Sequence, residues 1–388
     1  MHPLPFAKPN NPRFSTGPTA KRPGYDLSNL NRTLLGRSHR SVEILALLKT
    51  LISKIKTTLK IPADYRIVLT PGSDTGAMEL ALWNLMGPKP VDCVAWEAFG
   101  YMWLEDLAQL QIKNVREFRC NYGDFPNLEK VNFQEHDVIF TYCGTTSGIV
   151  FPVDIKIPAD RKGLIIADAT SYVFGEKVIW ENIDVLTFSW QKCLGGEAQT
   201  GVLVLSPKAL ARLNTYSPAW PIPHLFKIKQ NNKVDETLLD TGLPLNTLSI
   251  LTLLDFIDSL DWVENMGGLA FCQQKTADNF KIIYDWVQNS SWVSFVSKDN
   301  KNLSKLACCL QVTDPKYLAL SPEFQLKLLN DLHKILADEQ IAYDIRSHRK
   351  APLGLRIWCG VTVEEKDLML LTQWLDHYFH LCLEQHGN

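Results

Sequence analysis

Short apolar runs alternate with segments of helical periodicity over most of this chain. The apolar runs predict seven buried strands, at residues 66–70, 92–96, 115–119, 137–141, 163–168, 184–189 and 201–205. Helical periods fall around and between them, at residues 41–60, 76–86 and 103–110. This alternation predicts an α/β fold, in which helices cover both faces of a mainly parallel seven-stranded sheet.

The segments outside this alternation suggest how the chain is divided. Residues 1–32 are rich in Pro, Asn and Gly and predict an extended N-terminal arm. We expect a large domain over residues 33–255. A long helical segment begins near residue 248 and runs to about 287. Strands and helices mix toward the C-terminus, so residues 256–388 are expected to form a smaller α+β domain.

Composition narrows the class of protein. The 388 residues are 46% hydrophobic and 21% charged, and the net charge of −2 gives no reason to expect nucleic acid or an anionic membrane as partner. Nine scattered cysteines form no CxxC pair, so neither a zinc site nor a disulfide framework is indicated and no metal is expected. With no export signal or long apolar run, we expect a cytoplasmic protein that acts on small molecules.

An aspartate and a lysine stand at the carboxyl ends of two predicted strands. Asp168 ends the run 163–168, and Lys192 follows the run 184–189. Buried charges are costly, and sheets of this kind bind ligands beyond the carboxyl ends of their strands. Pyridoxal 5'-phosphate needs both groups, an amine that holds its aldehyde and an acid that keeps its ring nitrogen protonated. The pair indicates such a site, whereas either charge alone would more often be solvated at a sheet edge.

Three further segments fit this hypothesis, each with a plainer alternative. The turn 72–76 opens a helix after the first strand, where free N–H groups favour a phosphate, although Ser73 or Asp74 could simply cap the helix. Phe99 or Trp103 could stack on a planar ring or belong to the core. Thr145, after the strand 137–141, could donate to a phenolic oxygen or cap a turn.

Basic residues gather in two segments. One is Gly36-Arg37-Ser38-His39-Arg40, and the other is Ser347-His348-Arg349-Lys350, which precedes Arg356. Arg356 stands in an apolar, strand-like run, and a guanidinium there is suited to grip a carboxylate through two hydrogen bonds. We therefore expect Arg356 to bind an anion, while Arg37 and Lys350 fit solvated surface positions.

Taken in order, these segments resemble the phosphoserine aminotransferase family, class V enzymes of fold type I that use pyridoxal phosphate. Phe14-Ser15-Thr16-Gly17-Pro18 is similar to the family's opening signature, and residues 36–40 to its early His-Arg element. Asp168 and Lys192 match its ring-nitrogen acid and its lysine. The segments 245–247, 348–349 and 354–356 follow its later order, so the resemblance covers residues 14–360. The turn 72–76 lacks an arginine that many bacterial members carry, which removes one phosphate contact.

The resemblance implies a role for each candidate. Lys192 and Asp168 would be catalytic. The implied cofactor-binding residues are Ser73, Asp74, Thr75, Trp103, Thr145, Asp168, Gln191, Lys192, Asn246 and Thr247, with Asn246 and Thr247 reaching across a homodimer. The implied substrate-binding residues are His39, Arg40, His348, Arg349 and Arg356, of which Arg356 would hold the α-carboxylate and the others the substrate's phosphate.

The reaction implied is transfer of the amino group of L-glutamate to 3-phosphohydroxypyruvate, which gives O-phospho-L-serine and 2-oxoglutarate in serine biosynthesis. Formation of 4-phosphohydroxythreonine in pyridoxine biosynthesis is left open. The closest alternative is another class V enzyme, such as an alanine- or serine-glyoxylate aminotransferase, whose substrates lack a phosphate. Ser189 and Lys192 also fit the S-x-x-K spacing of a serine hydrolase, but the Ser-Asp-Asn and Lys-Thr-Gly motifs of that class are missing from the sequence.

Overall fold

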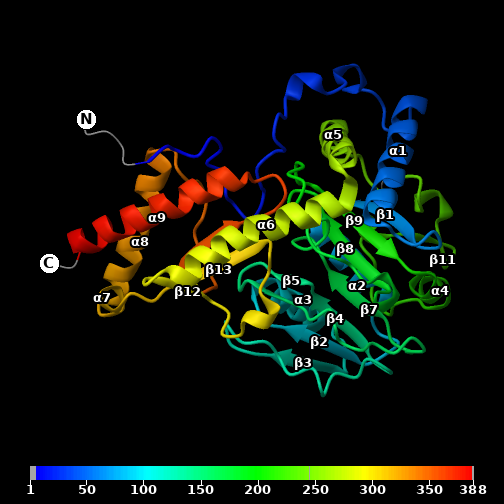
Figure 1. Cartoon of the computed structure of the whole chain (residues 1–388). Helices are drawn as coiled ribbons and strands as arrows, with labels where there is room; N and C mark the ends of the chain where they lie inside the picture. The colour runs from blue at the N-terminus through cyan, green and yellow to red at the C-terminus, as the bar shows by residue number, and fades with distance from the viewer. Residues whose placement is uncertain (1–5, 244, 387–388) are drawn as a thin grey trace.

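The computed structural model describes residues 6–243 and 245–386, and its centre is a seven-stranded sheet (Figure 1). The strand order is β1-β9-β8-β7-β4-β2-β3, and only β9 runs antiparallel to its neighbours. The strands are β1 (Arg66–Pro71), β2 (Val91–Ala95), β3 (Val115–Arg119), β4 (Asp137–Thr141), β7 (Ile165–Asp168), β8 (Val185–Ser189) and β9 (Thr200–Leu205). The predicted mainly parallel seven-stranded sheet is confirmed.

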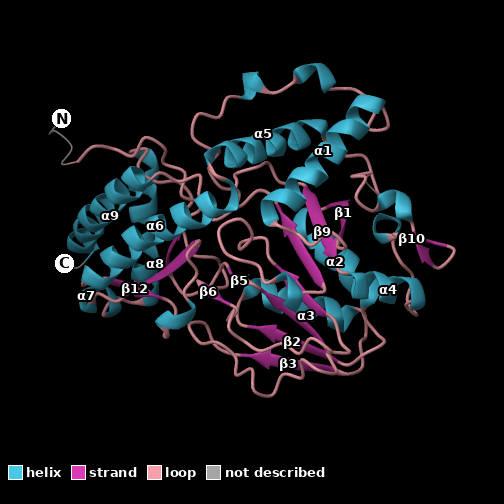
Figure 2. Ribbon diagram, turned by 45° about the vertical axis from the view of Figure 1, so that its right-hand side comes forward, coloured by secondary structure: helices cyan, strands magenta, loops and turns pink. Residues whose placement is uncertain are grey.

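Helices cover both faces of this sheet (Figure 2). On one face lie α2 (Ser73–Leu85), α3 (Ala98–Gln109) and α4 (Pro207–Thr215), whose apolar side chains share a core with Val68. The other face carries α1 (Val42–Leu59) and α5 (Ile250–Met266), which share a core with Ile67 and Leu69. Successive residues of a strand point to opposite faces, so a strand that is buried on both faces must be apolar throughout.

The predicted helical segment 248–287 is two helices. α5 ends at Gly267, and α6 (Gly268–Asn289) begins at the next residue. Both glycines have left-handed backbone angles, with φ of 114° and 71°, which glycine adopts without steric cost. The boundary predicted between residues 255 and 256 falls inside α5, so the division into domains stays a prediction.

A smaller α+β layer follows α6. Its antiparallel sheet consists of β12 (Val293–Phe295), β13 (Ala307–Val312) and β14 (Gly354–Trp358), and the chain also forms α7 (Pro315–Leu318), α8 (Pro322–Asp338) and α9 (Glu365–His386). Two short antiparallel ribbons complete the described strands, β5 (Cys143–Gly144) with β6 (Ile149–Val150) and β10 (Lys229–Gln230) with β11 (Lys233–Val234). Within the described residues, no helix is both long and apolar enough to cross a membrane.

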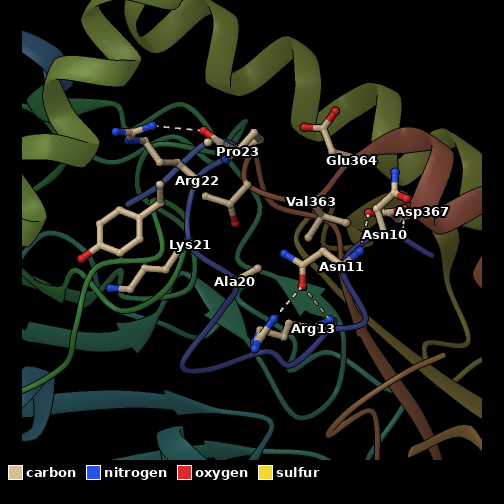
Figure 3. Close-up of a pocket in the computed structure, with 13 residues that line it drawn as sticks. Asn10, Asn11, Arg13, Ala20, Lys21, Arg22, Pro23, Val363, Glu364 and Asp367 are labelled. Atoms are coloured by element: carbon tan, nitrogen blue, oxygen red, sulfur yellow. Dashed lines mark hydrogen bonds between the residues drawn. The ribbon is translucent and has the colours of Figure 1, made fainter. Parts of the chain in front are cut away.

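The N-terminal arm contacts both the large part that holds the seven-stranded sheet and the smaller α+β layer. Its backbone at Asn10 and Asn11 donates to Asp367 at the start of α9 (Figure 3). Further along the arm, Arg22 pairs with Asp258 of α5. Between these anchors the arm crosses the carboxyl ends of the central strands, where Thr19 N–H donates to the carbonyl of Gln191. The cavity of about 310 Å³ in Figure 3 lies beside this crossing.

Candidate active site

Lys192 lies just beyond β8, beneath the N-terminal arm. Its Nζ donates to the carbonyl of Thr16, 2.5 Å away. Gly17 leaves the space for this amine, because a Cβ on Gly17 would lie 2.0 Å from Nζ. Burial, and after it the positive charge of Arg356, lowers the pKa of Lys192 to about 8. A substantial fraction of this amine is therefore neutral near physiological pH.

Asp168 ends β7, beside β8, as the sequence predicted. It is buried, and its Oδ1 accepts a hydrogen bond of 3.0 Å from the backbone of Thr170. Burial raises the pKa of Asp168, whereas Asp74, Thr170 and Lys192 act to lower it. Among the described residues Lys192 and Asp168 make no direct ion pair, although each shifts the pKa of the other. The two side chains thus lie close enough to interact without pairing, and the space between them is the candidate site.

The first turn of α2 forms one end of this space. Gly72 precedes the helix with a left-handed φ of 88° and provides no side-chain cap. The hydroxyl of Ser73 accepts a hydrogen bond of 3.1 Å from Gln191 Nε2, and Thr75 is exposed on the same turn. A helix N-terminus with a hydroxyl beside it is suited to an anion such as a phosphate.

Asp74, one residue further along the chain, points elsewhere. It is buried and lies within hydrogen-bonding range of Asp168. Burial, and after it the negative charge of Asp168, raises the pKa of Asp74 well above its usual range. This side chain therefore lies beside Asp168 rather than on the exposed side of the turn with Thr75.

The two aromatic candidates occupy different places. Trp103 is on α3, and its side chain is buried in the core, with 1% of the residue exposed. Its indole lowers the pKa of Asp168. Its Nε1 makes no hydrogen bond among the described residues. Phe99 is half-buried at the start of α3, and its ring centroid lies 6.1 Å from that of His348. Phe99 is thus the aromatic that borders the cationic residues.

Thr145 is buried in the loop after β4. Its hydroxyl donates to Ser171 at 2.7 Å, and its carbonyl accepts from the thiol of Cys309 on β13. Cys309 pairs in register with Arg356 on β14. These contacts bring the loop of the large sheet and the strand that carries Arg356 to the same place.

Arg356, His348 and Arg349 line one groove of about 1130 Å³, together with Gly17 of the arm. Burial lowers the pKa of Arg356, and its Nε has no hydrogen-bond partner among the residues that the structure describes. Burial, followed by the charges of Arg356 and Arg349, lowers the pKa of His348. The groove thus gathers positive charge that an anionic ligand would compensate.

Four predicted residues are not brought to this groove by the single chain. Arg40, Asn246 and Thr247 are exposed and His39 is half-buried. Over residues 6–243 and 245–386, no hydrogen bond or ion pair joins any of the four to Arg356, Arg349 or His348. Their assignment to cofactor and substrate stays a prediction.

Glu97 is a buried residue of the site that the sequence analysis missed. It caps α3, and its Oε1 accepts from the backbone of Phe99 at 2.8 Å while Oε2 accepts from the hydroxyl of Thr146 at 2.7 Å. Burial raises the pKa of Glu97 to about 7. A glutamate before the Phe99 segment was the available signal, but the helix was expected to begin only at residue 103.

The residues present fit pyridoxal phosphate. An amine and a carboxylate lie at the carboxyl ends of neighbouring strands and interact with each other, and Ser73 at the N-terminus of α2 is hydrogen-bonded to Gln191 beside the amine. Several buried polar atoms around this space have no partner within the described structure, namely Thr16 Oγ1, Asp74 Oδ1, Trp103 Nε1, Gln191 Oε1 and Arg356 Nε. Buried polar atoms are nearly always paired, so a group of unpaired ones is typical of a ligand site.

Comparisons with known proteins agree with this geometry. The family model for class V aminotransferases matches residues 25–328. The chain is 42% identical to the phosphoserine aminotransferase of Methanosarcina barkeri over 97% of this chain and 99% of that protein. It superposes with a TM-score of 0.79 on the phosphoserine aminotransferase of Cytophaga hutchinsonii, at 19% identity, covering 95% of this chain and 99% of that one. A pyridoxamine-pyruvate aminotransferase from Mesorhizobium loti gives the same TM-score at 16% identity, covering 98% and 95%.

The chain is a class V aminotransferase of fold type I, and its cofactor is pyridoxal phosphate. The fold alone does not identify the reaction, because structures that differ in reaction superpose equally well. Identity over nearly the whole length does distinguish them. Within its class, the chain belongs to the phosphoserine aminotransferases.

Proposed function

We propose that this chain uses one groove for both half-reactions of phosphoserine transamination, with L-glutamate giving its amino group to 3-phosphohydroxypyruvate. The observation that carries this assignment is the pair of arginines, Arg356 and Arg349, that line the groove next to Lys192 together with His348. Both amino donors carry two acidic groups, and a groove with several cations can hold each of them. Formation of 4-phosphohydroxythreonine is not distinguished by these residues.

Lys192 is the proposed base. When bound, pyridoxal phosphate supplies a protonated ring that draws electrons from the Cα of the substrate. Asp168, as an anion, holds the proton on the ring nitrogen. Lys192 takes the Cα proton and can return it, because its lowered pKa of about 8 leaves much of the amine neutral at working pH. The carbonyl of Thr16 aims the amine from the side of the arm.

The remaining residues hold the two ends of the ligands. Ser73, Thr75 and Gln191 would hold the cofactor phosphate at the start of α2. Arg356 would bind the α-carboxylate with two hydrogen bonds, while His348 and Arg349 would bind the substrate's phosphate or the distal carboxylate of glutamate. A bound anion would also reverse the depression of the His348 pKa and favour its charged form.

We infer that Phe99, rather than Trp103, covers the ring of the cofactor. Phe99 is half-buried and faces His348, whereas Trp103 is enclosed in the core and meets Asp168 with its indole. Trp103 would then support the ring-nitrogen acid from behind. Thr145, fixed by its hydrogen bond to Ser171, would face the phenolic oxygen.

We also propose a homodimer in which each subunit completes the other's site. His39, Arg40, Asn246 and Thr247 lie apart from the groove of their own chain. The segment with His39 and Arg40 also exposes apolar side chains, namely Leu27, Leu35 and Val42, the last 81% exposed. Apolar residues in such a segment fit an interface. The described cysteines are all free thiols, which supports the proposed location in the reducing cytoplasm.

The test is a single half-reaction. O-phosphoserine added to the purified holoenzyme should shift the visible absorbance of the cofactor to that of its aminated form, and glutamate should do the same. Lys192→Ala should abolish the starting visible band. A response to alanine or serine with none to O-phosphoserine would reject the assignment in favour of a glyoxylate-type aminotransferase.

A further inference from the structure

A second buried carboxyl group lies against the ring-nitrogen acid. Asp74, in the first turn of α2, is buried and interacts with Asp168 at the end of β7. A turn that holds a phosphate gains nothing from a carboxylate beside the dianion, because like charges repel. The direction of the Asp74 side chain avoids this conflict and raises the question of what the residue does.

The surroundings of Asp74 favour a carboxyl group that keeps its proton. The side chain is 8% exposed, and its Oδ1 makes no hydrogen bond within the described ranges. The hydroxyls of Thr170 and Thr187 lie near it, and the other carboxyl group of the pair is Asp168. Two buried carboxyl groups in hydrogen-bonding range cannot both be charged without a large cost, so one proton stays between them.

The charges around the pair decide which carboxyl group keeps that proton. Asp168 faces Lys192 and accepts from the backbone of Thr170, and both interactions favour its anion. Asp74 faces the negative charge of Asp168, with Lys192 as the more distant cation. Glu97 is a further acid whose charge interacts with that of Asp168. Asp168 is therefore the charged member of the pair.

We propose that Asp74 is a positioning residue, a neutral carboxylic acid whose O–H donates to Asp168 and fixes that carboxylate toward the ring nitrogen. This proposal deepens the proposed function, since it rests on Asp168 serving as the partner of the cofactor ring. Asp74 does not touch the reacting atoms. It acts by holding the orientation of Asp168 and by making Asp168 a weaker base, because a hydrogen bond to the charged form favours that form.

The first test uses the apoenzyme, so it does not depend on the reaction. A buried acid whose pKa is raised in the folded state makes the protein less stable as the pH rises above the pKa that the acid has in the unfolded chain. Asp74→Asn keeps a donor and the shape of the side chain but cannot ionise. The melting temperature of this variant minus that of the wild type should therefore grow from about pH 5 to about pH 8. A flat difference over this range is what an Asp74 without a raised pKa would give, and it would overturn the proposal.

The second test uses cofactor affinity and the pH dependence of the bound cofactor's visible band. Asp74→Asn, which can still donate to Asp168, should bind pyridoxal phosphate within a few-fold of the wild type. Asp74→Ala should bind it roughly tenfold or more weakly and shift the pH profile of the band, because the donor is lost. Asp106→Asn and Asp106→Ala are matched controls, since Asp106 is another buried carboxyl group of raised pKa but does not contact Asp168.

Equal losses in Asp74→Asn and Asp74→Ala would overturn the positioning role, because the amide would then fail to replace the acid. So would an unchanged pH profile in Asp74→Ala. A failed phosphoserine half-reaction would reject the proposed substrate but leave both of these measurements standing. The two proposals can therefore fail separately.

Discussion

Two largely buried arginines allow a direct test of whether a buried guanidinium stabilises the fold or binds a ligand. Arg161 is 8% exposed, and its Nε donates to Asp184 at 3.0 Å, with carbonyls of Pro158 and Glu181 as further acceptors. Arg356 is also enclosed, but in the described structure it forms no ion pair and its Nε has no partner. We replace each with Met, which keeps most of the side-chain volume and removes the charge.

The two substitutions should have opposite consequences. Arg161→Met leaves Asp184 buried without its main partner, which should lower the free energy of unfolding by about 3–5 kcal/mol. Arg356→Met removes a desolvated charge that forms no ion pair among the described residues, so the free energy of unfolding should fall by less than about 1 kcal/mol or rise. Loss of a charge-assisted contact to the substrate costs about 1.5–3 kcal/mol, which is roughly a ten- to hundredfold weaker affinity.

The assays are urea unfolding of both apoenzymes and a spectral titration of the holoenzymes with O-phosphoserine. A further effect comes from Lys192, because the cation of Arg356 lowers its pKa. Arg356→Met should therefore move the lysine titration from about pH 8 to higher pH, while Arg161→Met leaves it in place. If Arg356→Met destabilised the fold as much as Arg161→Met and left substrate affinity unchanged, Arg356 would be a structural residue and the proposed groove would be wrong.

Four further predictions follow from other contacts. In steady-state kinetics, Arg349→Ala should raise the KM for phosphoserine more than the KM for glutamate, by a factor equivalent to roughly 2 kcal/mol. Equal changes in the two KM values would show that the phosphate pocket lies elsewhere. In Gly17→Ala the new Cβ would lie 2.0 Å from Lys192 Nζ. This variant should carry out the half-reaction at least about tenfold more slowly, and calorimetry should show a loss of about 1 kcal/mol in stability. A normal rate would mean that the amine of Lys192 does not need this space. Lys192→Met should stabilise the apoenzyme at about pH 7 by up to roughly 3 kcal/mol. This gain should fade between about pH 8 and pH 10.5, as the lysine of the unfolded chain also loses its proton. A gain that does not change with pH, measured by urea unfolding, would contradict the lowered pKa of Lys192. Glu97→Ala should cost about 1–2 kcal/mol through loss of the cap of α3, measured by urea unfolding against the exposed control Glu105→Ala.

The strands and the two catalytic candidates could be predicted because their signals are local. A run such as Ile165–Asp168 is apolar on both faces and ends in a charge, so its own sequence specifies a buried strand and a polar end. Parallel neighbours then bring Asp168 and the residues after β8 to one edge. The family was predicted from the resemblance of short motifs, such as residues 14–18 and 354–356, in their order and spacing along the chain.

The details that the sequence did not predict depend on contacts between distant residues. α3 begins at Ala98 because Glu97 caps it, and Glu97 is held in turn by Thr146, 49 residues away. Asp74 of α2 likewise meets Asp168 at the end of β7, 94 residues further along the chain. Hydrophobic periodicity cannot report such contacts, since it records which face is buried and not which polar groups meet.

The unpaired polar atoms of the site suggest how the cofactor and the fold depend on each other. Each buried polar atom left without a partner costs about 1–3 kcal/mol, and Gln191 Oε1, Trp103 Nε1 and Arg356 Nε are three such atoms within the described chain. Gln191 follows β8 of the large sheet, Arg356 is on β14 of the smaller one, and Thr16 Oγ1 of the arm is also unpaired, so the arm and both sheets share this cost. Ligands that supply the missing partners would remove it, so binding of cofactor and substrate should stabilise the contact between the arm and the two sheets more than either sheet alone. Hydrogen exchange should then slow most at Thr16–Thr19 and at β14 when both ligands bind, and protection confined to α2 would show that the arm is not part of the site.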